Sequence, residues 1–444
     1  MNNNIVSAQE LRCRKPTDAQ RLEKYVGEQF ENQSIHVGFD ADVEALAEQD
    51  VLYGISTRRK DLRGLPCFTI DCADTKDMDD AVSLQREEDG WCLGVHIADV
   101  AEFAPFMSEL DTVAKERGTS IYLPNVTVPM LPPVLSNDLC SLVPQAERKA
   151  ISVFIHLDEL GNVRSFQLTK SLIRSRLKGT YNQVNRLLSR KASRKIAAKY
   201  AAVEETLRQM ELLAGILRSN RLTGGARICD EQTHKFKFVN GAVDISIEER
   251  GVAEGIVEEF MVLANEQVAK YCVKHGLPLV RRSHLRENTC AFYGLGDDGH
   301  AALALKDYAH FTSPIRRLAD LKVHQVLTAY LNGASAKMIH MMFDAELREC
   351  AEIATKRARR ANGVQKCAEN FCKILYFFAR RGREFTGTVY GSDSCGKTTI
   401  LVDELKVLVT VQRQCQEPEG KKVSFKVYAN PDEHRMHAYG VCAA

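Results

Sequence analysis

The sequence predicts an α+β protein, and three observations lead to that class. Residues 66–165 form short strand-like runs separated by loops. Helical periodicity dominates residues 193–221, 254–275 and 335–381. After Gly382, strand-like runs return at residues 384–390, 398–402, 406–411 and 422–428. Because strands and helices are segregated along the chain, we expect a mixed sheet with surrounding helices, followed by a short all-β unit.

The remaining elements follow from chain length and helix breakers. Residues 1–55 are too few for a core of their own and predict a helical lead-in. The helix over residues 254–275 is stopped by Gly276, and the segment 335–381 is expected to be interrupted near Gly363, because glycine weakens a helix. We therefore divide the chain into three units, at residues 1–55, 56–382 and 383–444.

Charge and cysteine usage restrict the class of partner and the compartment. The net charge of the 444 residues is only +2, so any grip on a polyanion must be local. The 14 cysteines include no C-x-x-C pair, which is typical of reduced thiols in the cytosol. No signal peptide and no apolar run of membrane-spanning length is present, so we expect a soluble, cytoplasmic monomer.

One stretch carries basic side chains without any acidic residue between them. It favours a nucleic-acid track over the alternative of a solvated helix face. Its members are Lys170, Arg174, Arg176, Lys178, Arg186, Arg190, Lys191, Arg194, Lys195 and Lys199.

Five aspartates fall within ten residues, directly behind the apolar run Cys67–Ile70. The run predicts a strand with Asp71 at its end, followed by a tight loop that carries Asp77, Asp79 and Asp80. So many like charges need a cation, and oxygen ligands without His or Cys favour Mg²⁺ or Mn²⁺.

Two alternatives for the aspartate run were considered. A calcium-binding EF-hand starting at Asp71 would place Lys76 at the turn glycine and Val82 at the closing glutamate, so its spacing does not fit. A solvated acidic turn is disfavoured because the run adjoins a buried strand and continues into Ala81–Leu84.

Residues 308–317 predict the start of a helix, with Ser313 as N-cap and Pro314 at the first helical position. Apolar residues recur until Asn332 and Gly333 end the helix. Arg316 in the first turn would then create a phosphate site at a helix N-terminus. Alone, this could be a capped surface helix, but beside a carboxylate metal site it predicts phosphoryl chemistry.

At these residues the chain resembles the ribonuclease II / ribonuclease R family of 3′→5′ exoribonucleases, which is built on the RNB domain. Thr69–Ala81 fits the family's first signature, and His310–Arg317 fits its second. The resemblance covers roughly residues 55–385 and includes further blocks at residues 59–63, 95–100, 117–124, 130–132, 139–142 and 256–261.

The resemblance implies an RNB-type catalytic domain over residues 56–382 and a short OB-fold-like RNA-binding domain over residues 383–444. A structural β-tail that no longer binds RNA is the alternative for the second unit. The implied activity is hydrolysis of single-stranded RNA from the 3′ end to nucleoside 5′-monophosphates, with two Mg²⁺ ions.

The resemblance also implies roles for individual residues. Asp71, Asp77 and Asp80 would be metal ligands. Asp79 would support the second metal and the leaving 3′ oxygen, and Arg316 would stabilise charge in the transition state.

Other positions would contact the RNA. Tyr122 would stack on the terminal base, and Tyr181 would lie near the cleaved linkage. Either Glu258 or Glu259 would contact the terminal sugar, while the basic contacts would include Arg174, Arg176 and Lys178. His96 and His310 are expected to be structural.

The chain departs from the family pattern in places. Cys229 replaces a phenylalanine opposite Tyr122, and Asn362-Gly363 replaces Glu-Arg in the late helix. The segment between residues 284 and 310 is shorter than is usual in the family, and no cold-shock-type domain is recognisable before residue 60. An RNA-binding protein with weak catalysis is therefore the second function hypothesis.

A third hypothesis is NTP hydrolysis, because Gly391–Thr398 fits the Walker A pattern. A P-loop needs a following helix, whereas Thr398–Val402 is strand-like, so we expect a hairpin loop and no nucleotide cofactor. Gly294–Gly299 fits the dinucleotide fingerprint, but Asp297 and Asp298 would repel a pyrophosphate, so a loop is expected there too.

Overall fold

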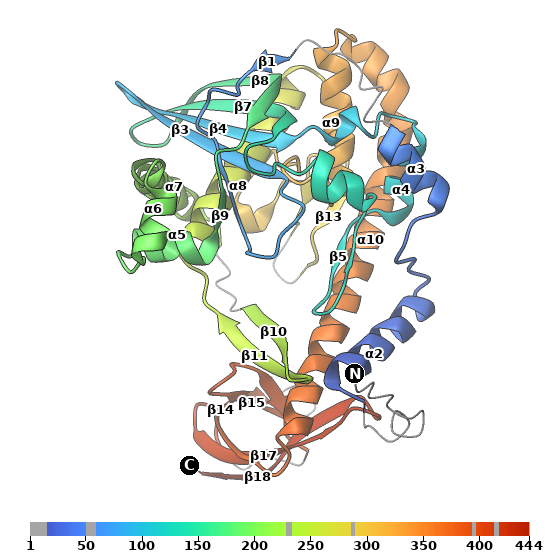
Figure 1. Cartoon of the computed structure of the whole chain (residues 1–444), viewed down its shortest axis with the longest axis vertical. Coiled ribbons are helices and arrows are strands. Elements are labelled where there is room, and N and C mark those ends of the chain that lie inside the picture. The colour runs from blue at the N-terminus through green and yellow to red at the C-terminus, as the bar shows by residue number, and fades with distance from the viewer. Residues whose placement is uncertain are drawn as a thin grey trace, which may run out of the picture.

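The computed structural model describes residues 16–49, 59–227, 233–285, 289–392, 397–412 and 417–443. A central sheet with surrounding helices forms the larger part, and a second sheet lies at the far end of the long helix α10 (Figure 1). The predicted α+β class with a C-terminal all-β unit is confirmed.

The central sheet has five strands in the order β1-β8-β7-β4-β3. β1 runs parallel to β8 and the other pairs are antiparallel, so the predicted mixed sheet is confirmed. Along β4, the alternating residues Trp91, Leu93, Val95 and Ile97 belong to the main core. The strands are β1 (Lys60–Asp61), β3 (Asp80–Glu87), β4 (Gly90–Ala98), β7 (Glu147–Asp158) and β8 (Val163–Arg174).

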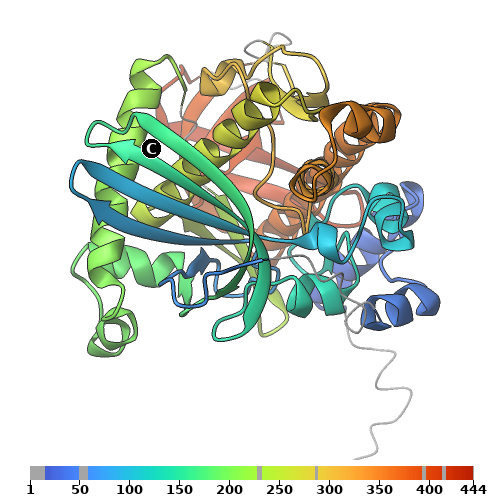
Figure 2. The same cartoon turned by 90° about the horizontal axis from the view of Figure 1, so that it is seen from above.

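One face of this sheet is covered by helices, of which α7 contacts β3 and α8 contacts β4 (Figure 2). Leu207 of α7 and Phe260 of α8 are buried in the same core as Leu93. The predicted helices around residues 193–221 and 254–275 are confirmed. The helices in this layer are α5 (Tyr181–Leu188), α6 (Arg194–Tyr200), α7 (Glu204–Thr223) and α8 (Val252–Lys274).

The helix α10 (Ala336–Ala379) connects the two parts of the molecule (Figure 1). It runs for 44 residues without a break, so the predicted interruption near Gly363 is wrong. Ala361, Val364 and Ala368 are buried around that position. Their packing offsets the cost of about 1 kcal/mol that a glycine adds to a helix.

The lead-in contains α2 (Asp18–Asn32) and α3 (Ala41–Gln49), which confirms its helical character over the described residues. α2 packs on α10, whereas α3 contacts α4 (Glu109–Arg117). Within the described residues, no helix is both long enough and apolar enough to cross a lipid bilayer.

Short elements shape the loops around the sheet. β2 (Thr69–Asp71) pairs in parallel with β9 (Lys178–Thr180), and the hairpin of β10 and β11 was not predicted. The segment after Gly294 is a loop, as expected. The other short elements are the helix α9 (Leu318–Leu331), the strands β5 (Ile121–Tyr122), β6 (Thr127–Val128), β10 (Thr233–Val239), β11 (Ala242–Glu248), β12 (Arg281–Ser283) and β13 (Phe292–Gly294), and single turns at Val100–Glu102, Leu135–Leu139 and Ala301–Leu303.

The C-terminal sheet is antiparallel, in the order β16-β15-β14-β17-β18, and forms the OB-like unit. Its fifth strand, β18, was not predicted because its one histidine and its glycine mask the β signal. Gly391 ends a strand and Thr398 begins the strand paired with it, so a P-loop is excluded; residues 393–396 lie outside the described residues. The strands are β14 (Glu384–Ser392), β15 (Thr398–Val402), β16 (Leu408–Thr410), β17 (Lys422–Asn430) and β18 (Arg435–Ala443).

The face of the central sheet opposite α7 and α8 carries buried polar groups. His96 lies between Ser83 and Ser152, with ring nitrogens at 3.0 and 2.7 Å from their hydroxyl oxygens. Burial lowers the pKa of His96 to about 3, so the ring is neutral. These contacts agree with a structural role for His96.

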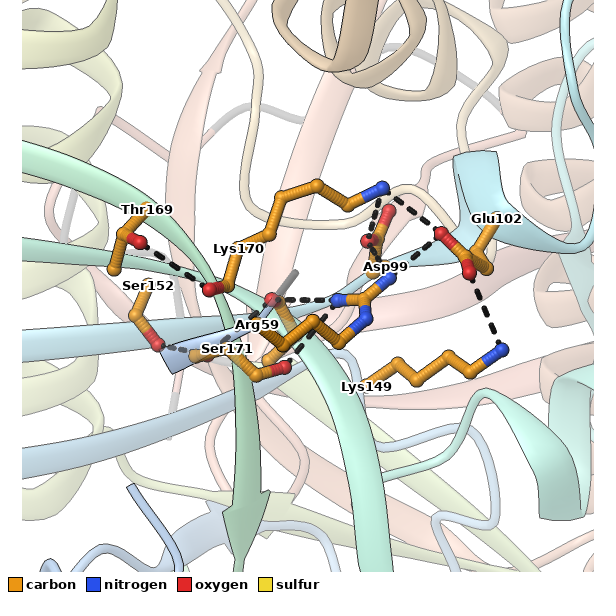
Figure 3. A network of polar contacts seen from close by, with 9 residues as sticks. Arg59, Asp99, Glu102, Lys149, Ser152, Thr169, Lys170 and Ser171 are labelled. Atoms are coloured by element: carbon orange, nitrogen blue, oxygen red, sulfur yellow. Dashed lines mark hydrogen bonds and ion pairs between the residues drawn. The ribbon is translucent and has the colours of Figure 1, made fainter. Parts of the chain in front are cut away.

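A cluster of oppositely charged side chains lies next to these buried polar groups, and we call it the Arg59 cluster (Figure 3). The Arg59 guanidinium donates to Asp99 and to Glu102 at 2.7 Å each, and the Lys170 ammonium lies 2.8 Å from Glu102 and 3.3 Å from Asp99. Lys149 completes it at 3.3 Å from Glu102. Burial would raise the pKa of Asp99, but Lys170 and Arg59 hold it below its ordinary value. Each of the two carboxylates therefore has at least two cationic partners.

Candidate active site

The two predicted motifs meet in the structure. Asp79 is almost fully buried, and one of its oxygens accepts the backbone N–H of Ile315 at 2.8 Å. Its other oxygen lies 3.3 Å from Nε of Arg316. Asp79 thus joins the aspartate run to the 313–317 turn, although 236 residues of sequence separate it from Ile315.

The 313–317 turn is not the helix start that the sequence predicted. α9 begins at Leu318 with Arg317 as its N-cap, so Ser313 is not a cap and Arg316 does not lie in the first helical turn. The reason is tertiary: Arg317 has an extended backbone and forms a β-bridge with Thr119, and the N–H of Leu318 donates to the carbonyl of Gly118 at 3.0 Å. The proposed phosphate site at a helix N-terminus is therefore wrong.

Asp320 is a residue that the sequence reasoning missed. Its carboxylate is fully buried and accepts from the Arg317 guanidinium at 2.7 and 2.9 Å as well as from Ser313. It therefore holds both ends of the turn that presents Arg316. An acidic residue three positions after Arg317, on an otherwise apolar helix face, was the available signal.

Asp71 ends β2, as predicted, whereas Asp80 is the first residue of β3 and not a loop residue. Within the described residues, neither carboxylate is in ion-pair contact, and Oδ2 of Asp71 is buried without a hydrogen-bond partner. Burial, followed by the charges of Asp80 and Asp77, raises the pKa of Asp71 to about 7. Burial raises the pKa of Asp80 to about 6, against the opposing charges of Arg316 and Arg317.

These carboxylates fit a divalent cation. They offer hard oxygen ligands in an environment that disfavours their negative charge. One of these oxygens, Oδ2 of Asp71, accepts no hydrogen bond. Mg²⁺ is commonly held by one or two carboxylates together with substrate phosphates and water, so a complete protein cage is not required.

Two predicted tyrosines lie beside the aspartates. The Tyr122 hydroxyl, from β5, donates to Oδ2 of Asp77. Burial and then the charge of Asp77 raise the pKa of Tyr122 above its ordinary value. Tyr181, the first residue of α5, has its pKa raised by burial and then by the charges of Asp80 and Asp71. The structure thus brings both rings to the candidate site.

The basic stretch divides into different environments. Lys178 donates to the backbone carbonyls of Ala73 and Thr75 and so supports the aspartate loop. Arg174 pairs with Glu147 at 2.6 Å, and Arg176 donates to the carbonyl of Gly64 at 3.2 Å. Lys170 is buried in the Arg59 cluster, so its place in a surface track for nucleic acid is wrong.

Glu258 and Glu259 are both held by Arg221, at 3.3 and 2.6 Å. Glu259 is 2% exposed and thus unavailable at the surface, whereas Glu258 is half-buried and also pairs with Arg250. Their contacts therefore connect α7 and α8.

Cys229 lies outside the described residues, and His310 lies 2.8 Å from the Tyr293 hydroxyl.

A second group of possible metal ligands lies at the other end of β3. Ligand atoms of Glu87, Cys92 and His156 come within 4.8 Å of one another. Nδ1 of His156 is 3.0 Å from Glu87, so the imidazole and the carboxylate already form a pair. The oxygen, sulfur and nitrogen ligand atoms of this group differ from the all-oxygen ligands of the aspartate site.

The fold and the paired motifs agree with a comparison of families. The RNB domain family model matches residues 59–293 and 289–333. The chain therefore belongs to the RNB domain family.

Individual relatives define the position of the chain within the family. Ribonuclease R 1 of Lactococcus lactis is 32% identical over an alignment of 412 positions, which covers 80% of this chain and 50% of that protein. The chain thus spans about half the length of this curated relative. RNase R of Mycoplasma genitalium, in its apo form, has a similar fold, with a TM-score of 0.83 at 23% identity over 94% of this chain and 78% of that one.

A more distant fold neighbour sets a limit on inference from fold alone. Yeast Ssd1, described as a pseudonuclease, has a TM-score of 0.61 at 18% identity, covering 86% of this chain and 53% of that one. The fold therefore does not decide catalysis, and the residues of the site must do so.

Proposed function

We propose that this chain is a 3′→5′ exoribonuclease that hydrolyses single-stranded RNA to nucleoside 5′-monophosphates. One observation carries the proposal: within the described residues Asp71 and Asp80 are partly buried without an ion-pair partner, and Asp79 joins their loop to Arg316. The names of the curated relatives support RNA as the substrate.

The residues of the chain divide the work. Asp71, Asp77 and Asp80 would hold two Mg²⁺ ions, or Mn²⁺ in their place. When bound, the ions would polarise the scissile phosphate and lower the pKa of a water that attacks it. Arg316 would face the same phosphate and stabilise the charge that develops there.

Asp79 has a more specific part in this proposal than the family resemblance alone implied. Because its two oxygens accept from Ile315 and Arg316, it would orient the arginine toward the phosphate. Asp320 would hold the same turn from the other side. Arg316 would therefore reach the reaction already positioned, which lowers the reorganisation needed in the transition state.

The RNA end would be held by aromatic and basic groups. Tyr122 and Tyr181 would stack on bases near the 3′ end, which suits an enzyme that is indifferent to sequence. Lys178, Arg174 and Arg176 would contact the backbone, while Glu258 is the more accessible of the two glutamates for a sugar hydroxyl. The ten cysteines in the described residues are all unpaired, which supports a cytoplasmic location.

The test uses RNA labelled at its 5′ end, with and without Mg²⁺. We expect a ladder of labelled products that shorten one nucleotide at a time, together with unlabelled nucleoside 5′-monophosphates identified by chromatography. Immediate release of a labelled mononucleotide would mean the opposite direction and contradict the proposal. RNA that is bound but not shortened would favour the second hypothesis, a binding protein with weak catalysis.

A further inference from the structure

A cavity of about 750 Å³ lies where the segment 34–40, α4 and α10 meet, close to the hairpin of β5 and β6. Figure 1 shows α3 and α4 beside α10 in this region. Its volume lies within the range of about 300–1,000 Å³ that is usual for small-ligand sites. Ile121 lines the cavity, whereas the next residue, Tyr122, bonds Asp77. The cavity is therefore on the opposite side of β5 from the candidate active site.

Three arginines line this cavity: Arg117, Arg357 and Arg360. Within the described part of the chain, none of the three has a carboxylate in ion-pair contact. The acidic residues in the lining, Asp40 and Glu116, are both exposed. The charges of Asp40 and Glu116 act on Arg117, but the three arginines outnumber these two carboxylates, so the lining carries an excess of positive charge that a bound anion would satisfy.

Neutral contacts hold these guanidinium groups in place. Arg117 lies over the ring of Phe39 at 3.8 Å and donates to the carbonyl of Pro129 at 3.1 Å. Arg360 donates to the carbonyl of Gln33 at 3.0 Å, and its Nε–H is buried without an acceptor. Burial lowers the pKa of both side chains, and for Arg360 the charge of Arg357 adds to the effect. The groups are thus positioned but not paired.

The third arginine is positioned by a glycine. Gly118 has a φ of +72°, and a Cβ at this residue would lie 2.5 Å from Cγ of Arg357. Only glycine allows the stem of Arg357 to pass so close to the end of α4. The stem of Arg357 is therefore held against the end of α4, and Arg357 lines the same cavity as Arg117 and Arg360.

The wall of the cavity is also the support of the candidate active site. Thr119 lines the cavity, and its hydroxyl donates to the carbonyl of Arg316 at 2.9 Å. The N–H of Ser120 donates to the same carbonyl at 3.0 Å. The segment 117–122 thus connects the cavity arginine Arg117 to Arg316 and to Tyr122.

We propose that this cavity binds a small phosphate-bearing anion, of the class of inorganic phosphate, pyrophosphate and nucleoside phosphates, between Arg117, Arg357 and Arg360. Bound anion would order the segment 117–122 and, through Thr119 and Ser120, the backbone at Arg316. The site does not depend on the proposed nuclease activity, and only an effect on turnover would rest on it.

Calorimetric titration of pyrophosphate into metal-free protein tests the site. Arg357→Gln keeps most of the packed stem and removes the charge, so affinity should fall by about tenfold or more, the effect of one charge-assisted hydrogen bond. Arg359→Gln is the matched control, since Arg359 is on the same helix and lines a different cavity. It should change affinity by less than about twofold, as should Arg316→Ala, because neither side chain lines the site.

The possible results separate the alternatives. Equal weakening by Arg357→Gln and Arg359→Gln would mean a diffuse basic surface, and unchanged binding by Arg357→Gln would place the anion elsewhere; either overturns the proposal. If Arg357→Gln weakens the binding of a single-stranded RNA oligomer as much as the binding of pyrophosphate, the cavity belongs to an RNA path and the small-anion proposal is wrong.

Hydrogen exchange tests the connection to Arg316 without any catalytic assay. Pyrophosphate should slow exchange of the amides in residues 117–122 in the wild type and not in Arg357→Gln. Protection in the variant equal to that in the wild type would overturn the proposed coupling. If the wild-type protein does not hydrolyse RNA, the proposed nuclease activity is refuted, and both of these results still stand.

Discussion

The aspartate site and the Arg59 cluster use similar groups with opposite electrostatic outcomes. In the Arg59 cluster, Asp99 is buried but lies against Arg59 and Lys170, and its pKa is held below the ordinary value. In the aspartate site, Asp71 is partly buried beside other carboxylates, and its pKa is raised to about 7. Burial acts to raise the pKa of both carboxyls, but Asp99 has two cations in ion-pair contact, whereas Asp71 has none within the described residues and lies near other carboxylates.

The comparison also shows which signal identifies a functional carboxylate. Asp99 and Asp71 each have one buried oxygen without a hydrogen-bond partner, so an unpaired oxygen alone does not distinguish them. The direction of the pKa shift does. A carboxylate that the protein leaves uncompensated is unfavourable for folding and needs a separate reason, which the proposed metal ion would provide.

The largest effect is expected from removing a carboxylate of the uncompensated set. Asp80→Asn should lower the rate of RNA hydrolysis by roughly a thousandfold or more, because a metal ligand is lost. RNA binding should stay equal or become tighter, since a charge that repels phosphate is gone. Product formation and RNA affinity are measured in parallel, with Asp74→Asn, from the same loop and exposed, as the control. Near-normal hydrolysis by Asp80→Asn would refute the metal assignment.

The Arg59 cluster should respond in stability and not in chemistry. Lys170→Met removes the buried ammonium that contacts both Asp99 and Glu102, and breaking such a buried pair costs about 3–5 kcal/mol. The free energy of unfolding is measured with urea. Lys149→Met is the control, because Lys149 is 30% exposed and its loss should cost less than about 1 kcal/mol. Equal losses in the two variants would show that the burial of Lys170 is not what matters.

Arg316 belongs to the candidate active site, but it has a carboxylate partner, Asp79, as the cations of the Arg59 cluster do. Arg316→Ala should lower turnover by about a hundredfold, while RNA affinity changes by less than about threefold, because its charge is needed mainly in the transition state. Arg316→Lys should restore part of the turnover. Single-turnover rates and equilibrium binding give the two quantities. A parallel loss of both would make Arg316 an ordinary phosphate contact.

The smallest effect concerns the stability of the metal-free protein. Burial raises the pKa of Asp80 from 3.8 to about 6, so the folded state binds a proton more tightly than the unfolded state. The destabilisation builds as pH rises from 3.8 to about 6 and is complete above that range. Asp80→Asn should therefore raise the free energy of unfolding at neutral pH by about 1–3 kcal/mol.

The same measurement has two internal controls. At a pH near 4 the gain should disappear, because the wild-type carboxyl is then largely protonated. Added Mg²⁺ should stabilise the wild type more than Asp80→Asn, since the variant has lost a ligand. A gain that persists unchanged at low pH would mean that packing, and not charge, stabilises the variant.

Local sequence determined much of this protein. The apolar run before Asp71 forms β2, the helix over residues 254–275 is α8, and the β-branched residues after Gly391 form a strand and not a P-loop helix. These predictions succeeded because each depends on side-chain periodicity and on residues that stop or favour an element within a few positions.

Tertiary contacts decided the rest. α9 begins at Leu318 because Arg317 is held extended in a β-bridge with Thr119, and Leu318 donates to Gly118, so a segment far away in the sequence sets the helix start. Lys170 is a buried partner of Glu102 and not a surface contact. Hydrogen bonds and charge pairs between distant segments outweigh local propensities of about 1 kcal/mol, and no local pattern records them.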